Sequence, residues 1–346
     1  MRPVPLNVMT LYADLAQRLG LQDVRPGSIS TKTVDGKKYL YAVERDGQAR
    51  IQRFLGPAGS DAAKEDAERI RQASVQAREL RNTVTLLKNA RIPRPSALLG
   101  RILEVIANAG LFQRGVTLVG TAAYQTYSCI VGSYLPAATL TTNDVDLSLA
   151  EFVAAAEEED IGAILRRADS TIKPHWFAED KLPRVFKAQN GFTVDFLTRL
   201  GHGKQAGKPV LVKSLGCAAI PLSFQEYPVE ETIEAVALHG TGVLVRVPTP
   251  IRFAVHKLIV AQRRRGTDTT KKQKDLMQAR ELIDVFLATD DVALQDALDE
   301  ARSRGKAWKS AINASLEEIG REARQGVPPL PVAPTSRSRV GRRSKA

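Results

Sequence analysis

Hydrophobic and polar positions in the first sixty residues predict one helix and a small sheet. Residues 5–21 repeat leucine at helical spacing (Leu11, Leu15, Leu19), which indicates a short amphipathic helix. Residues 28–55 instead alternate apolar and polar positions in three stretches, separated by Asp-Gly at 35–36 and again at 46–47. Asp-Gly between alternating stretches is a strong hairpin signal, so we expect a three-stranded antiparallel meander.

The next stretch predicts two helices of different character. Residues 61–90 contain no Gly or Pro and are rich in strong helix formers, which favours one long helix. That segment is too polar for a core helix, so we expect it to connect the meander to the next domain or to pair with another chain. Residues 96–108 place Leu98, Ile102 and Ile106 on one stripe and end at Gly110, so this helix should pack on a sheet.

The pattern then changes to a buried strand that turns sharply. The apolar run 116–119 reaches Gly120 and Thr121, and an Ala- and Tyr-rich segment with helical spacing follows. Glycine permits a close backbone approach at such a turn. Because the first N–H groups of a helix lack intrahelical partners, and the helix dipole is positive there, the turn at Gly120 and Thr121 can hold a phosphate.

Three aspartates occur within segments that otherwise alternate as strands. Asp144 and Asp146 share one face of the segment DVDLSL, because residues i and i+2 of a strand point the same way. Asp195 occupies a similar position in FTVDFLT. Neighbouring carboxylates repel each other, and a bound divalent cation is the usual relief.

The remainder predicts further helices and short strands. We expect a helix at 151–168 with the acidic run 157–160 near its middle, a hairpin through Asn190 and Gly191, and strands at 233–238 and 243–247 that extend the sheet. Pro250 begins a helix that carries His256 and Lys257, and helices continue to about residue 322. His256 has the character of a packing residue and Asp275 that of an ion-paired one. Segment 199–208 is rich in glycine and in basic residues, and it is either a phosphate clamp or a surface loop.

Composition adds a preference for polyanions. The 346 residues carry a net charge of +12 with a pI near 9.8, which favours nucleic acid or nucleotides as partners, although solvated helix faces and the basic tail explain part of the excess. The meander has six basic residues that form either a nucleic-acid-facing sheet or a solvated face; we favour the latter, since no exposed aromatic platform is evident beyond Tyr39 and Tyr41. The basic residues are Lys32, Lys37, Lys38, Arg45, Arg50 and Arg53.

The chain has two cysteines and four histidines, which argues against a disulfide-stabilised fold and against a zinc site. The cysteines make no disulfide framework, and the histidines form no cluster at zinc-ligand spacing. We find neither a signal peptide nor an apolar run of membrane-spanning length, so the expected location is the cytoplasm, with no membrane partner.

The order of these motifs resembles a known family. A strand ending in Gly120-Thr121, then Asp144-x-Asp146 on a second strand and Asp195 on a third, resembles the nucleotidyltransferase fold of the DNA polymerase β-like superfamily. The stretches LVGTAAYQTY, TTNDVDLSL, VPTPIRFAVHKLIVAQRR and KKQKDLMQARELID resemble a poorly characterised bacterial family within it, over roughly residues 95–290. Thr121 stands where the superfamily usually has serine, and the gap to Asp144 is longer than in minimal enzymes.

The resemblance implies an activity and a set of site residues. It implies transfer of NMP from an NTP to a hydroxyl of RNA, protein or a small molecule, with Mg²⁺ or Mn²⁺ bound by the three aspartates and pyrophosphate released. The catalytic and metal residues would be Asp144, Asp146 and Asp195, and the nucleotide-binding residues would be Gly120, Thr121, Lys257 and Lys274. An alternative is a catalytically inactive nucleic-acid-binding or regulatory protein that keeps the fold, with its aspartates capping loops or pairing with arginines.

The expected fold class is α+β with five parts. These are an N-terminal helix and meander (1–60), a connecting helix (61–94), a nucleotidyltransferase-like mixed-sheet core (95–249), a C-terminal helical domain (250–325) and a disordered basic tail (326–346). A tail with no acidic residue can also bind polyanions nonspecifically. Its binding would be sensitive to salt and independent of the three aspartates.

Overall fold

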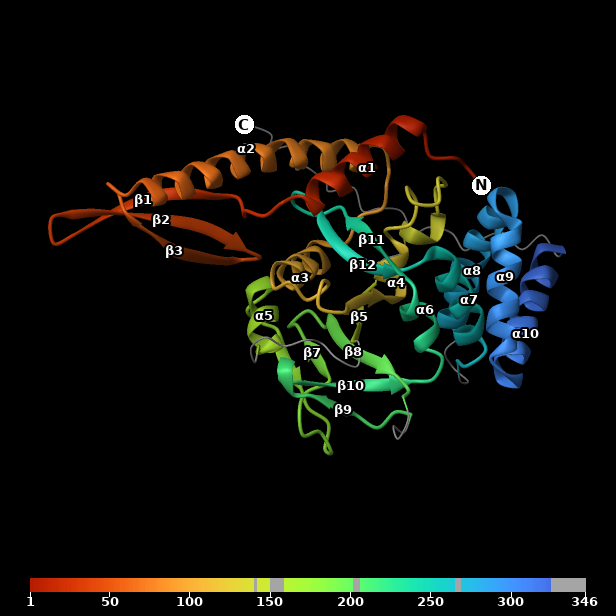
Figure 1. Cartoon of the computed structure of the whole chain (residues 1–346). Helices are drawn as coiled ribbons and strands as arrows, with labels where there is room; N and C mark the ends of the chain where they lie inside the picture. The colour runs from red at the N-terminus through yellow and green to blue at the C-terminus, as the bar shows by residue number, and fades with distance from the viewer. Residues whose placement is uncertain (140–141, 150–158, 202–205, 265–268, 325–346) are drawn as a thin grey trace, which may run out of the picture.

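The protein consists of a projecting arm and a body that contains a mixed sheet (Figure 1). The computed structural model describes residues 1–139, 142–149, 159–201, 206–264 and 269–324. The predictions for Glu157 and Glu158, for residues 202–205 of the basic glycine segment, and for the tail from 326 fall outside these residues. No helix in the described ranges is both long enough and apolar enough to cross a membrane.

The arm is the predicted meander with the predicted long helix. Strands β1 (Gly27–Val34), β2 (Lys37–Asp46) and β3 (Ala49–Pro57) form an antiparallel sheet in the order β1-β2-β3. Helix α2 (Asp61–Asn89) runs along this sheet and continues beside α1 (Leu6–Gly20) on the body. Its buried face consists largely of alanines at helical spacing, which lets the helix approach the strands closely.

The body is built on a seven-stranded sheet. The central strand β8 (Thr193–Arg199) pairs parallel with β5 (Asp144–Leu149) on one edge. On its other edge it pairs antiparallel with β7 (Val185–Lys187) and parallel with β10 (Cys217–Leu222). Outer positions belong to β4 (Val116–Val119) next to β5, β9 (Val210–Val212) next to β10, and β6 (Lys173–His175) next to β7.

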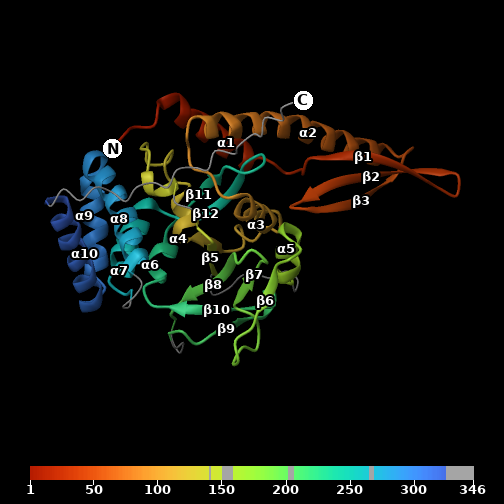
Figure 2. The same ribbon diagram turned by 180° about the vertical axis from the view of Figure 1, so that it is seen from behind.

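Helices cover this sheet and complete the body (Figure 2). Helix α3 (Ala97–Asn108) begins at Ser96, whose hydroxyl accepts from the N–H of Leu99, and buries the predicted apolar stripe. Helix α5 (Ile161–Ala168) packs beside it. The C-terminal part contains α6 (Glu226–Glu230), α7 (Pro250–Ala261), α8 (Thr269–Thr289), α9 (Asp291–Ser303) and α10 (Lys306–Arg324).

Two sequence-based predictions need correction. Strands β11 (Thr232–Ala237) and β12 (Val243–Pro248) form a separate two-stranded sheet and do not extend the main one. The two strands pair antiparallel across the turn at His239 to Gly242, so their backbone N–H and C=O groups bond to each other. Helices α1 and α3 pack against the pair. Of the helix expected at 151–168, residues 151–158 lie outside the described residues, and the described part is helical from Ile161, with Asp160 as an N-cap that accepts the N–H of Gly162. The acidic run therefore ends at a helix start.

The segment after Gly120 also differs from the expected full helix. Helix α4 (Gly120–Tyr124) has only five residues, and turns follow it up to the 3₁₀ helix η1 (Pro136–Thr139). Gly132 has a φ of +68° and Pro136 lies at the start of η1, so neither position suits a continuing α-helix. Aromatic packing holds the segment instead, since the ring of Tyr124 stacks on Phe253 with centroids 5.5 Å apart.

Candidate active site

The pairing of β5 with β8 brings the three predicted aspartates together. Asp146 lies directly opposite Asp195 in the parallel register, and Asp144 lies opposite Thr193. Because side chains alternate along a strand, Asp144 and Asp146 share one face, and Asp195 joins them from the neighbouring strand. Two short strands thus place three carboxylates on one side of the sheet.

Gly120 lies against the central carboxylate. Strand β4 pairs with β5 so that Val119 is opposite Asp146, and Gly120 follows immediately. Its φ is +66°, and a Cβ atom at this position would lie 2.5 Å from Oδ2 of Asp146. Glycine is therefore required here for two independent reasons, its backbone conformation and the proximity of the carboxylate.

Helix α4 is too short to provide the helix dipole that we expected to attract a phosphate. Five residues give only a small helix dipole, so attraction for an anion at Gly120 and Thr121 must come from the backbone N–H groups of the turn. The turn is held in place by Tyr124, whose hydroxyl donates to Glu281 at 2.7 Å. Glu281 also accepts from the N–H of Ala137 at 3.0 Å, which ties α8 to both segments.

The carboxylates perturb one another. Burial raises the pKa of Asp146 to about 7, and the charges of Asp144 and Asp195 add to the effect. Lys257 and Arg264 act against that rise without cancelling it. The pKa of Asp195 is raised as well, chiefly by burial, while the hydroxyl of Thr193, which donates to Oδ2 at 2.9 Å, opposes the shift. Thr142 donates similarly to Asp144.

Lys257 is held in an ion pair next to these carboxylates. Its ammonium lies 2.5 Å from Oδ1 of Asp275, and Nε of Arg264 donates to Oδ2 at 2.9 Å. Burial alone would raise the pKa of Asp275, but the two cations outweigh burial and lower it. Asp275 is therefore ion-paired as expected, and Lys257 influences Asp146 through its charge while bound to another residue.

Lys274 lies beside the carboxylates from the adjacent position of α8. Burial lowers its pKa, Lys257 lowers it further, and Asp144, Asp275 and Asp146 act in the opposite direction. Its ammonium is thus within electrostatic reach of two of the three site aspartates. Burial lowers the pKa of the neighbouring His256 to about 3, so this histidine is neutral near pH 7, as a packing residue would be.

The donor set suits a hard divalent cation, although the side chains do not enclose one. Within the described ranges, no group of three or more His, Cys, Asp or Glu side chains is arranged to hold a metal ion. The carboxylates instead face local partners, the two threonine hydroxyls and the Gly120 turn. Three oxygen-donor side chains that repel each other are nevertheless what Mg²⁺ or Mn²⁺ prefers, so the residues fit the expected ion in chemistry.

Sequence reasoning missed several neighbours of the site. Thr193 was detectable, because it is two residues before Asp195 in a strand and must share its face. Lys271, whose charge lowers the pKa of Asp195, lies one helical turn before Lys274; the sequence showed it only as part of a basic block, suited to phosphates or to solvent, and did not connect it with Asp195. One turn after Lys274, the fully buried amide of Gln278 has no hydrogen-bond partner in the part of the chain that the structure describes.

The site residues lie within the segment that matches a known family. Comparison with curated proteins and with solved structures finds no significant match. A family model described as nucleotidyltransferase matches residues 97–303, which include Gly120, all three aspartates and both site lysines. This match covers more than half of the chain and agrees with the mixed-sheet α+β fold. The chain therefore belongs to the nucleotidyltransferase family.

Proposed function

We propose that the protein transfers a nucleoside monophosphate from an NTP to a hydroxyl acceptor and releases pyrophosphate. The observation that supports the proposal most strongly is the register that sets Asp146 beside Asp195 and against the Gly120 turn. In this proposal residues 95–249 supply the carboxylates, and residues 250–325 supply Lys257 and Lys274. The general activity follows from family membership, whereas the metal dependence and the residue roles are part of the proposal.

Asp144 and Asp146, with Asp195, would hold Mg²⁺ or Mn²⁺. The raised pKa of Asp146 shows that its negative charge lacks sufficient compensation in the protein alone. A divalent cation held there would neutralise triphosphate charge and polarise the reacting phosphoryl group. Two other buried acids nearby are already engaged, because Asp275 binds two cations and Glu281 accepts hydrogen bonds from Tyr124 and Ala137.

The protein's own groups would then position the substrates and move the proton. Asp195 would accept the proton of the acceptor hydroxyl, and burial raises its pKa, which would make it a better base than an ordinary aspartate. The acceptor oxygen forms a bond to the α-phosphorus while the bond from that phosphorus to the bridging oxygen breaks. The Gly120-Thr121 turn and Lys274 would bind the departing pyrophosphate, and Lys257 would add positive charge next to Asp146.

Labelling with each of the four α-³²P NTPs, in Mg²⁺ or Mn²⁺, tests this function. Total cellular RNA and total protein serve as acceptors, and the Asp144→Asn/Asp146→Asn double variant is the comparison. We expect label transfer by the wild type and a loss of at least about a thousandfold in the variant, since several kcal/mol of transition-state stabilisation disappear. The molecule that carries the label identifies the acceptor class.

A charge-matched control separates the site from a general charge effect. The Asp291→Asn/Asp296→Asn variant removes two exposed acids from α9 and should transfer label at the wild-type rate. Circular dichroism should show the same helix content in all three proteins. Equal transfer by wild type and site variant would contradict the role given to Asp144 and Asp146, and no transfer with any NTP would contradict the proposal and favour a catalytically inactive binding protein.

A further inference from the structure

The sheet of the arm has one covered face and one outer face. Ala42 is fully buried on the covered face, and a Cβ atom on Gly56 would lie 3.2 Å from Ala63 of α2. A Cβ atom on Gly27 would likewise lie 3.4 Å from Ile70 of α2. Since side chains alternate, the residues between these positions point away from α2 and form what we call the outer face.

Three aromatic rings cluster on the outer face. Phe54 contacts Tyr39 with ring centroids 5.9 Å apart and Tyr41 with centroids 5.4 Å apart. The strand register places Phe54 opposite Tyr41, and both tyrosines occupy alternate positions of β2. Phe54 is 56% exposed, which is unusual for a phenylalanine in the centre of a sheet strand. The cluster therefore presents aromatic surface to solvent.

Positive charge surrounds this cluster. The ammonium of Lys32 lies 4.8 Å from the centroid of the Tyr41 ring and donates to Gln52 at 2.7 Å. The strand positions of the outer face include no Asp or Glu, because Glu44 and Asp46 belong to the covered face. The basic residues of the outer face are Lys32, Lys37, Arg45 and Arg50.

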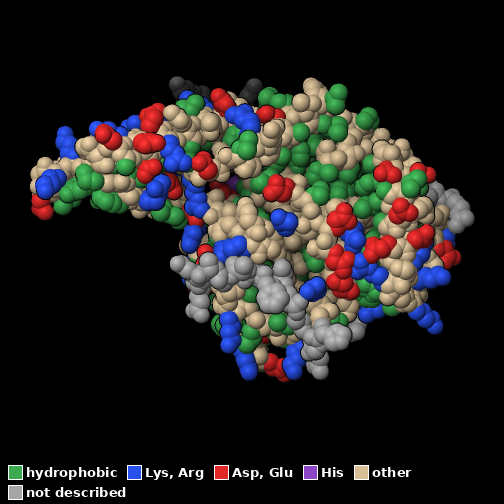
Figure 3. Space-filling model, viewed as in Figure 1, with side chains coloured by type: hydrophobic (Ala, Val, Ile, Leu, Met, Phe, Trp, Pro, Cys, Tyr) green, Lys and Arg blue, Asp and Glu red, His purple; other side chains and the backbone are tan. Residues whose placement is uncertain are grey.

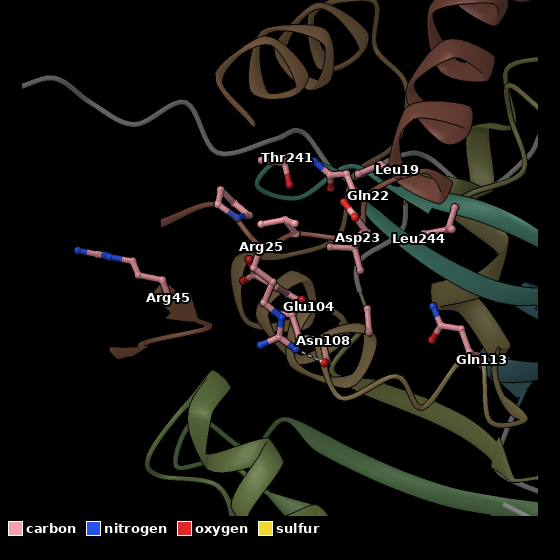
Figure 4. Close-up of a pocket in the computed structure, with 15 residues that line it drawn as sticks. Leu19, Gln22, Asp23, Arg25, Arg45, Glu104, Asn108, Gln113, Thr241 and Leu244 are labelled. Carbon is pink, nitrogen blue, oxygen red and sulfur yellow. Dashed lines mark hydrogen bonds between the residues drawn. The ribbon is translucent and has the colours of Figure 1, made fainter. Parts of the chain in front are cut away.

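The outer face lies on the projecting arm, next to a cleft in the body. Figure 3 shows hydrophobic and basic side chains together along the lower edge of the arm. At the base of the arm, a cavity of about 290 Å³ has Arg45 on one side and Glu104 and Asn108 of α3 on the other (Figure 4). Arg25 donates to the carbonyl of Asn108 within it. The cavity has charges of both signs, so phosphate groups should prefer the outer face.

We propose that the outer face of the β1–β2–β3 sheet binds single-stranded RNA. Unpaired bases stack on aromatic side chains carried by a sheet, and lysines and arginines around the rings contact the phosphates. Duplexes keep their bases stacked internally and cannot use exposed rings in this way. RNA is the partner to expect, because most unpaired nucleic acid in a cell is RNA. This binding is independent of nucleotide transfer, since no residue of the carboxylate site takes part.

Fluorescence anisotropy with fluorescein-labelled oligoadenylate and oligouridylate tests the proposal on the full chain. Phe54→Ala should weaken binding about tenfold, because stacking of one base is lost. Leu86→Ala is the matched control, since Leu86 is a similarly exposed (54%) apolar residue on α2, and should bind as the wild type does. Phe54→Leu should weaken binding as Phe54→Ala does, because leucine keeps apolar area but cannot stack.

Salt dependence tests the phosphate contacts. Arg50→Gln should reduce the slope of log K against log salt by about 0.7, the value for one phosphate contact with a single strand. Arg78→Gln, which removes an exposed charge from α2, should leave the slope unchanged. The Asp144→Asn/Asp146→Asn variant should bind RNA normally, so failure of transfer and failure of binding are distinguishable.

Four outcomes would overturn the proposal. They are no RNA binding at low salt, unchanged binding by Phe54→Ala, full binding by Phe54→Leu, and tighter binding to duplex or to single-stranded DNA of the same sequence. Thermal melting of each variant, with a midpoint equal to that of the wild type, establishes that a binding loss does not reflect unfolding. A face that binds an apolar protein partner in place of RNA would give the first outcome, because such a surface does not require affinity for nucleic acid.

Discussion

Two clusters of charged side chains lie next to each other in the body, one of half-buried carboxylates and one built around the buried pair Lys257 and Asp275. On β5 and β8, three aspartates face one another, and the pKa of Asp146 rises to about 7. Between α7 and α8, Asp275 lies between Lys257 and Arg264, and its pKa falls. Both clusters include carboxylates in a low-dielectric interior, so burial alone does not explain the difference; the number of nearby cations does.

This contrast leads us to expect a structural role for the ion-paired cluster, and it supports the proposal that the carboxylate cluster binds a cation. Neutralised charges in the interior maintain the arrangement of helices, and removing one leaves its partner unpaired. Like charges held together destabilise the fold and persist where function requires them, so they indicate a binding site for a cation or a cationic complex. The carboxylate cluster should therefore tolerate neutralisation well, and the ion-paired cluster should tolerate it poorly.

The largest expected effect is at the ion-paired cluster. Asp275→Asn leaves the buried ammonium of Lys257 without its counter-charge, which should lower the free energy of unfolding by about 3–5 kcal/mol. Urea unfolding monitored by circular dichroism measures this. Asp299→Asn is the control, because Asp299 forms an exposed ion pair with Arg302 and its side chain is 73% exposed, so the cost should stay below about 1 kcal/mol. Equal costs for the two variants would remove the distinction between the clusters.

The second effect has the opposite sign. Asp146→Asn should raise the free energy of unfolding at pH 8 in EDTA, by at most about 4 kcal/mol, the free-energy equivalent of a pKa increase from 3.8 to about 7. The pKa of Asp146 in the folded state lies above its unfolded value of 3.8. Its contribution to the stability of the wild type is therefore fully present below pH 4 and is lost as the pH rises through 7. The gain in the variant should therefore vanish near pH 4.

Unfolding curves at several pH values, measured for both proteins, check this second prediction. Subtraction of the two curves isolates Asp146 from every other titrating group. Adding Mg²⁺ at pH 8 should stabilise the wild type and not the variant, because only the wild type has the full carboxylate set. A variant less stable than the wild type at pH 8, without metal, would contradict the view that these carboxylates are under-compensated.

Much of the carboxylate site was predictable, because strands determine faces. Alternation in DVDLSL and FTVDFLT predicted strands and placed Asp144, Asp146 and Asp195 on strand faces, as the structure has them. The sequence could not provide the parallel register that sets Asp146 opposite Asp195, since such pairing joins segments about fifty residues apart and depends on the whole sheet. The same limit explains the error at β11 and β12, whose alternation predicts strands but not their partners.

The outer face of the arm was underestimated for a related reason. The turns and strands of the meander followed from Asp-Gly and alternation, and the structure confirms them. However, a register irregularity between Leu40 and Tyr41 determines which β3 residues lie beside the tyrosines, and it puts Phe54 next to them. From sequence alone no exposed aromatic platform was evident beyond Tyr39 and Tyr41, and a solvated sheet was the favoured interpretation. The third ring requires the cross-strand pairing.

The smallest effect concerns a single hydrogen bond within the carboxylate cluster. The Thr193 hydroxyl donates to Asp195 at 2.9 Å and holds the pKa of that carboxyl lower than burial alone would. Thr193→Val keeps the side-chain shape and removes the donor, so the pKa of Asp195 should rise further. Thr193→Ser keeps the donor and should leave it unchanged. Carboxyl ¹³C NMR titration of Asp195 measures this without requiring activity. A fall in the valine variant, or equal shifts in both variants, would show that the hydroxyl does not set the charge of Asp195, and the carboxylates would then be controlled by burial and mutual repulsion alone.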